Sequence, residues 1–126
     1  MMTDFTLNGR PTRWLLAIAG LLGAMGVATA AGASHGDPRL LGSVSAICLS
    51  HAPALLAISL FGMRDRILSA AAVLLALGAG LFSADLIWRA FVGSAMLPML
   101  APISGGAMIL GWIVLVIAAA VSGRTL

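Results

Sequence analysis

The chain alternates long apolar stretches with short polar breaks, and four of the stretches are long enough to cross a bilayer. A crossing helix needs about 20 apolar residues, because the hydrocarbon core is ~30 Å thick and a helix rises roughly 1.5 Å per residue. The predicted spans are residues 14–31, 40–63, 67–87 and 103–121. The pattern therefore predicts an all-α fold: one membrane domain over residues 1–126, built as a four-helix transmembrane bundle with short loops.

The breaks between the spans contain turn-forming and charged residues. Residues 32–39 read GASHGDPR and predict a turn between the first two spans. The sequence Arg64-Asp65-Arg66 joins the second and third spans as an antiparallel hairpin. Prolines and a glycine pair divide the last uncharged stretch, and its first part, residues 90–101, is too short to cross. We expect that part to lie at the membrane interface or to extend a helix.

The composition places the chain in a membrane rather than in water. It is 61% hydrophobic and 9% charged, whereas about 25% of the residues of a soluble domain are charged. All of its basic residues are arginines, and most lie at the edges of apolar stretches. A nucleic-acid-binding protein would gather them on one face. We therefore expect membrane lipids as the surroundings and no nucleic-acid partner.

The arginines predict an orientation, because cytoplasmic loops of membrane proteins carry an excess of basic residues. The side of the two termini holds Arg10, Arg13, Arg64, Arg66 and Arg124, and the opposite side holds Arg39 and Arg89. This bias predicts a multi-pass protein of the bacterial inner (plasma) membrane with both termini in the cytoplasm.

The first span has an alternative interpretation as a cleavable secretory signal. Arginines precede it, and Ala28-Thr29-Ala30 resembles a cleavage site. Cleavage would leave three spans. The apolar run is longer than the usual signal core of about 7–15 residues, which favours a retained span.

Small residues recur at every fourth position within the spans. In lipid, helices associate where small residues allow their backbones to approach closely. We expect helix packing, within the bundle or against a membrane-protein partner or a second copy, at Gly20, Ala24, Gly42, Ala46, Ser50, Ala76, Gly80 and Gly111.

His51 is predicted to lie near the bilayer midplane, where an ionisable group is a functional candidate until a structural partner is found. Pro53 lacks an amide donor and leaves the carbonyl of Leu49 free. Three interpretations remain open: a neutral histidine that donates to a neighbouring helix, a proton relay or ligand contact, and a metal or haem ligand. His35 lies about 15 Å away along the membrane normal, too far to share a metal. We therefore expect no metal site and no cofactor.

Asp85 and Arg89 are four residues apart with the acid first, the favourable order for a helical ion pair. A second interpretation joins them with His35 and Asp37 in a ligand site on the outer side. The spacing of a hydrolytic triad, a phosphate-binding loop or paired carboxylates is not found in the sequence. We therefore expect no catalytic residue and no enzymatic activity.

Four sequence motifs resemble those of one family. Residues 31–36 (AGASHG) are similar to a GAFGAHG signature, and residues 51–56 (HAPALL) to H-A-L-A-L-L. Residues 75–86 (LALGAGLFSADL) are similar to LALGxxLFSGSL. Residues 101–105, followed by Gly111-Trp112, are similar to T-P-[IV]-G-G and G-W. On these motifs the chain resembles the domain of unknown function 423 family of small bacterial membrane proteins.

The resemblance implies a four-span protein of the bacterial inner membrane, and it implies no activity. Two positions depart from the family pattern: Pro53 replaces a leucine, and Asp85 falls where the family usually has serine. The acidic group at position 85 is therefore expected to be a feature of this chain.

The leading functional hypothesis is an accessory or scaffolding subunit that packs against other membrane helices. The alternative is a small oligomeric transporter or channel for a proton, ion or small solute. It would use His51 at the midplane and an outer mouth formed by His35, Asp37, Asp85 and Arg89. A third hypothesis is a haem- or quinone-associated redox subunit.

Overall fold

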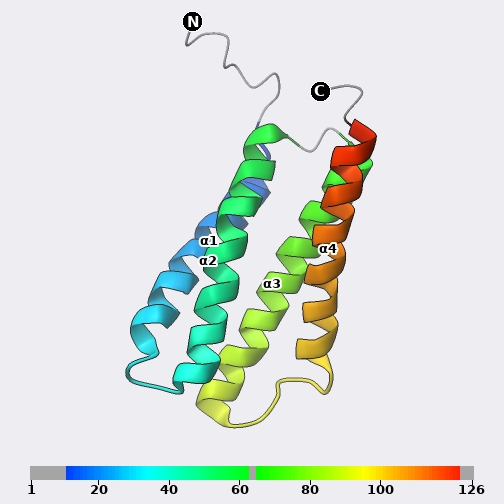
Figure 1. The fold of residues 1–126 in the computed structure, drawn as a ribbon. Coiled ribbons are helices and arrows are strands. Elements are labelled where there is room, and N and C mark those ends of the chain that lie inside the picture. Colours follow the sequence, from blue (N-terminus) through cyan, green and yellow to red (C-terminus); the bar gives the residue numbers. More distant parts are fainter. Residues whose placement is uncertain (1–10, 63–64, 123–126) are drawn as a thin grey trace, which may run out of the picture.

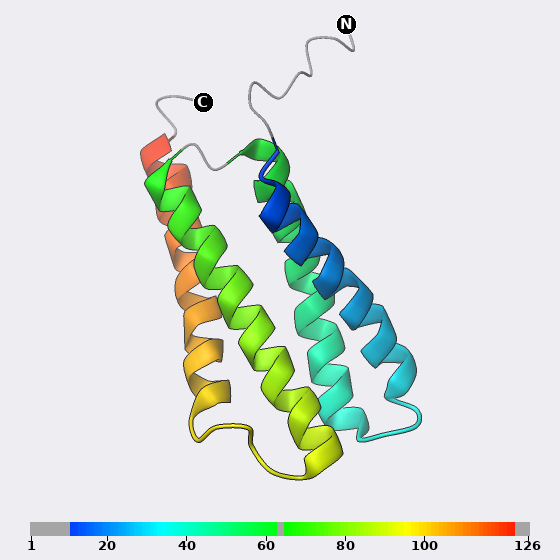
Figure 2. The same ribbon diagram turned by 180° about the vertical axis from the view of Figure 1, so that it is seen from behind.

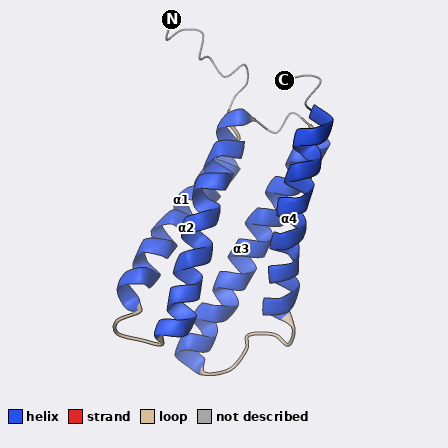
Figure 3. Cartoon of the chain, in the orientation of Figure 1, coloured by secondary structure: helices blue, strands red, loops and turns tan. Residues whose placement is uncertain are grey.

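The computed structural model describes residues 11–62 and 65–122, and this part of the chain is all-helical, without strands (Figure 3). All of the helices are long and apolar enough to cross a membrane. The predicted all-α class and the number of spans are thus confirmed. The helices are α1 (Arg13–Gly32), α2 (Pro38–Phe61), α3 (Arg66–Val92) and α4 (Leu100–Ser122).

Two aspartates start the middle helices, and glycines follow their ends. The Asp37 carboxylate accepts from the backbone N–H groups of Arg39 at 2.9 Å and Leu40 at 3.2 Å, and so caps α2. Asp65 caps α3 in the same way. The helix α3 ends at Val92, and Gly93 directly after it has a φ of 86°, which suits a residue without a Cβ.

The third helix is longer than the predicted span 67–87. It continues through residues 90–92, so Asp85 and Arg89 lie within it. Residues 93–99 form the connection to α4. Pro102 is accommodated in the first turn of α4, where a proline loses no helical hydrogen bond.

The helices form two antiparallel hairpins, α1–α2 and α3–α4, which meet where α2 packs against α3 (Figures 1 and 2). In the described residues the backbone of α4 comes close to that of α3, and not to that of α1 or α2. The α1–α2 and α3–α4 loops lie at the same end of the molecule. The bundle is therefore more open than a closed ring of four helices.

Close packing within each hairpin depends on glycines. A Cβ at Gly26 in α1 would lie 2.7 Å from Cγ of Leu49 in α2. A Cβ at Gly78 in α3 would lie 2.7 Å from Cγ of Met108 and 2.9 Å from the backbone oxygen of Ser104, both in α4. Of the small residues predicted to pack, Gly111 makes such a contact with Leu75, and Ala76 is buried.

The other small residues predicted to pack point away from the interior of the chain. Gly20, Ala24, Ala46 and Ser50 are exposed, and Gly42 and Gly80 are partly exposed. The buried face of α1 instead follows alternating steps of four and three residues, through Leu15, Ala19, Leu22, Gly26 and Thr29. An α-helix has about 3.6 residues per turn, so residues spaced four apart rotate gradually around the helix and do not stay on its buried face. That the exposed small residues pack against a partner stays a prediction.

Replacing Gly78 by alanine should destabilise the α3–α4 hairpin by about 1–3 kcal/mol, because the added Cβ overlaps backbone atoms of α4. A matched control is Gly80→Ala, whose Cβ meets nothing within 4 Å, so its effect should stay within about 0.5 kcal/mol. The measurement is unfolding in mixed micelles by SDS titration, followed by circular dichroism. Equal stability of the two variants would contradict the close approach at Gly78.

Candidate functional site

Polar side chains on α2 reach each of the other helices. Ser45 Oγ donates to the carbonyl oxygen of Gly26 in α1 at 2.8 Å. Cys48 Sγ lies 3.2 Å from the hydroxyl of Ser83 in α3, and both residues are completely buried. His51 reaches α4 through its imidazole. Because a polar group in hydrocarbon needs a partner inside the protein, these bonds make α2 the centre of the fold.

His51 is 5% exposed, and both of its ring nitrogens are engaged. The indole N–H of Trp112 in α4 donates to Nε2 at 3.2 Å. On the other side of the ring, Nδ1 lies 2.8 Å from the carbonyl oxygen of Ile47 and 3.2 Å from the hydroxyl of Ser50. An indole N–H can only donate and a carbonyl oxygen can only accept. The histidine is therefore neutral, with its proton on Nδ1.

The direction of the interhelical bond differs from the expectation that His51 donates to a neighbouring helix. The ring donates within its own helix, to Ile47, and accepts from α4, because tryptophan offers a donor and no acceptor. The rings meet edge to face, with centroids 5.6 Å apart at 66°. Pro53 and Leu49 lie away from this contact, on an apolar groove between α1 and α2.

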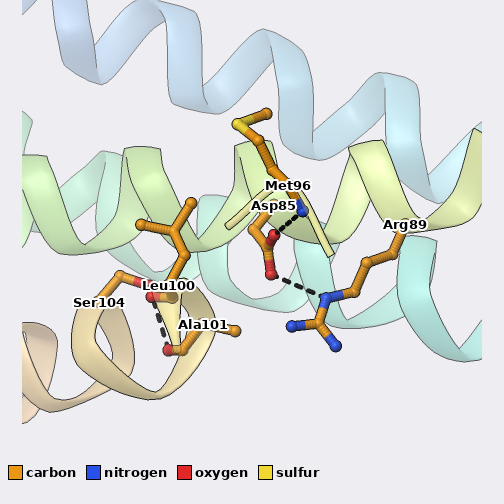
Figure 4. Close-up of polar contacts among 6 residues, drawn as sticks. All are labelled: Asp85, Arg89, Met96, Leu100, Ala101 and Ser104. Carbon is orange, nitrogen blue, oxygen red and sulfur yellow. Dashed lines mark hydrogen bonds and ion pairs between the residues drawn. The ribbon is translucent and has the colours of Figure 1, made fainter. Parts of the chain in front are cut away.

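Asp85 is completely buried near the C-terminal end of α3, and both carboxylate oxygens are bonded (Figure 4). Oδ2 accepts from Nε of Arg89 at 2.8 Å, so the ion pair expected from the spacing is present. Oδ1 accepts from the backbone N–H of Met96 at 2.8 Å, a bond that the residue pattern does not predict. Asp85 therefore fastens the α3–α4 loop to α3. Beyond the loop, Ser104 bonds back to the carbonyl oxygens of Leu100 and Ala101 in the first turn of α4.

The other residues of the predicted outer site lie in the α1–α2 loop. Asp37 is exposed, and its carboxylate caps α2. The side chain of His35 is also exposed. Both loops lie at one end of the molecule (Figure 1), yet within the described residues no hydrogen bond or ion pair joins His35 or Asp37 to Asp85 or Arg89. In the same residues, no three His, Cys, Asp or Glu side chains gather where a metal could bind.

A shallow apolar groove of about 450 Å³ runs along the outer face of the α1–α2 hairpin. Gly20 and Gly23 of α1 and Ala52 and Pro53 of α2 are among its lining residues. A Cβ at Gly23 would meet Cβ of Ala52 at 3.8 Å, an ordinary contact, and a Cβ at Gly20 would meet nothing within 4 Å. Because glycine has no side chain, nothing projects from these positions to fill the groove.

A family model described as "Protein of unknown function (DUF423)" matches residues 22–105, more than half of the chain. The chain belongs to the DUF423 family. This result confirms the resemblance seen in the motifs. Neither curated proteins nor solved structures gave a match. The part matched to DUF423 includes His51 and Asp85, and it ends before Trp112.

Replacing Asp85 by alanine should release the α3–α4 loop, because the amide of Met96 loses its acceptor. A hydrogen bond to a charged group contributes about 1.5–3 kcal/mol, so amide exchange in residues 93–99 should become roughly tenfold faster or more. Hydrogen–deuterium exchange in lipid nanodiscs measures it. Asp37→Ala is the control, since it removes a helix cap and should leave this loop unchanged. Unchanged exchange in Asp85→Ala would show that the loop is held by other contacts.

Proposed function

We propose that this DUF423 protein is an accessory or scaffolding subunit of the bacterial inner membrane, which packs its α1–α2 hairpin against a helix of another membrane protein. Its four helices of membrane-spanning length and its family support the membrane setting. The groove between α1 and α2 supports the packing role.

The proposal rests on one observation: the groove between α1 and α2 is lined in part by glycines and faces away from the rest of the chain. Gly20 and Ala24 are exposed on α1, and Gly20 and Gly23 line the groove. The hydrophobic effect does not drive helix association in lipid, and contact between helices depends on small residues that let the backbones approach. Within the chain Gly26 already serves the α1–α2 contact. Gly20 and Ala24 are thus available to a helix from outside.

The interior polar groups support structural roles more than transport. Both nitrogens of His51 and both oxygens of Asp85 are bonded inside the protein. Among the described residues, every buried side-chain nitrogen and oxygen has a partner. A transporter or redox subunit would use such groups for a solute or a cofactor. In this structure they hold helices and a loop together.

The orientation belongs to the proposal as well. Arg13 and Arg66 start α1 and α3, at the end where the described chain begins and finishes, and Arg39 and Arg89 lie at the end of the two loops (Figure 1). The bias towards cytoplasmic termini also depends on Arg10, Arg64 and Arg124, which lie outside the described residues. Placing both termini in the cytoplasm therefore rests on the sequence.

Replacing Gly20 by leucine should abolish most partner binding and leave the chain folded, because a Cβ at this position meets no atom of the chain within 4 Å. The matched control is Gly106→Leu on the exposed side of α4, where a Cβ is also unopposed. Native mass spectrometry of tagged protein extracted in native-lipid particles measures the complex. We expect roughly tenfold less complex for Gly20→Leu, a loss of about 1.4 kcal/mol.

Two results would overturn the proposed packing surface or the existence of a partner, and a third would change the kind of partner. One is a wild-type chain that stays monomeric and without a protein partner in native lipid. The other is a complex that Gly20→Leu leaves intact. A complex that contains a different membrane protein supports the accessory role. A complex of identical chains would replace it with self-association on the same face.

A further inference from the structure

The contact between α2 and α4 is made by side chains across a gap in the backbone packing. Each hairpin is tightly packed at its glycines, Gly26 in α1–α2 and Gly78 in α3–α4. The hairpins meet along α2 and α3, where Cys48 contacts Ser83. The backbones of α2 and α4 do not come close, and the indole of Trp112 bridges to His51. Loss of this bridge would leave α4 attached to the other hairpin through α3.

The bridge requires a histidine without a proton on Nε2. The Nδ1 proton is committed to the carbonyl of Ile47, and Nε2 accepts the indole proton of Trp112. A second proton on the ring can bind only at Nε2. It would then face the N–H of Trp112, and two donors cannot form a hydrogen bond. Protonation of His51 and its bond to Trp112 therefore exclude each other.

The surroundings give a protonated His51 no counter-ion in its present position. The described part of α4 carries no ionisable side chain, and on α1 the arginine at position 13 is at the helix start. On α2 the neighbouring ionisable group is the thiol of Cys48, which contacts Ser83, and Arg39 is in the first turn. On α3 the Cys48–Ser83 register places Asp85 roughly 7 Å from His51 along the helix axis.

The charges of α3 are also committed elsewhere. The carboxylate of Asp85 is occupied by Arg89 and the Met96 amide. Arg66 is at the opposite end of the helix. An imidazolium at position 51 would therefore be a charge in apolar surroundings without a partner, and it gains solvation if the seam between α2 and α4 opens.

We propose that Trp112 and His51 form a proton-sensitive clasp between the two hairpins. It is closed while His51 is neutral, and protonation of Nε2 opens it so that α4 moves away from α2. The clasp is a conformational device, independent of the proposed function on the outer face of α1–α2. His51 is the only buried histidine among the described residues, and the clasp makes use of its ability to take up a proton.

The test is the distance between spin labels on α2 and α4 in lipid nanodiscs, measured by pulsed electron paramagnetic resonance. The labels go on Leu56→Cys and Ile117→Cys, both at exposed positions, in a Cys48→Ser background that replaces the thiol beside Ser83 with a hydroxyl, which can also form a hydrogen bond. Histidine changes charge between about pH 5 and 8, so the distance is measured at about pH 8.5 and about pH 5. We expect a shift to longer and broader distances at the lower pH.

Two substitutions separate the clasp from a general effect of pH. His51→Gln can still donate and accept but does not titrate, so its distances should be the same at both pH values. Trp112→Phe removes the indole donor, so its distances should already be long at the higher pH. Circular dichroism checks that each variant is folded, and if one is not, the other decides. The proposal is overturned if wild-type distances do not change with pH, if His51→Gln shows the same shift, or if Trp112→Phe keeps the short distance.

Discussion

The structure depends on one constraint of its surroundings: a polar side chain inside a membrane must find its partner within the protein. On the second helix, three buried side chains meet this constraint through bonds to the other helices. Ser45, Cys48 and His51 occupy successive turns of α2 and bond to α1, α3 and α4 in that order. Lipid offers these side chains no water to bond with, so each takes its partner from a neighbouring helix. Each bond therefore also holds that helix in position.

The same constraint explains why the ionisable groups look functional in the sequence and structural in the fold. An aspartate in an apolar helix is tolerated only if its charge is paired, and Asp85 has both a guanidinium and a backbone amide. As a result, the buried carboxylate of Asp85 holds the α3–α4 loop against α3. His51 is similar in that its two nitrogens join a carbonyl and an indole. It differs in that one added proton would break the arrangement.

The chain belongs to the DUF423 family, and its described helices are long and apolar enough to cross a membrane. The chain packs its glycines selectively: Gly26, Gly78 and Gly111 are used inside, whereas Gly20 faces out beside an apolar groove. The proposed packing against a partner uses this outward-facing surface, because the interior polar groups of the described residues are already bonded within the chain.

The sequence by itself determined the all-α class, the approximate extent of the helices and the Asp85–Arg89 ion pair, because these depend on local properties: the length of an apolar stretch and the spacing of residues along one helix. It also identified the family through its motifs. Only the tertiary structure decided which face of each helix is buried. Small residues occur on exposed faces of the helices, as at Gly20, and on buried faces, as at Gly111. Their spacing therefore does not show how each helix is rotated about its axis in the bundle. Trp112 beside His51 and the Met96 amide beside Asp85 were decided in the same way, since each pairs groups on different segments whose approach depends on how the hairpins pack.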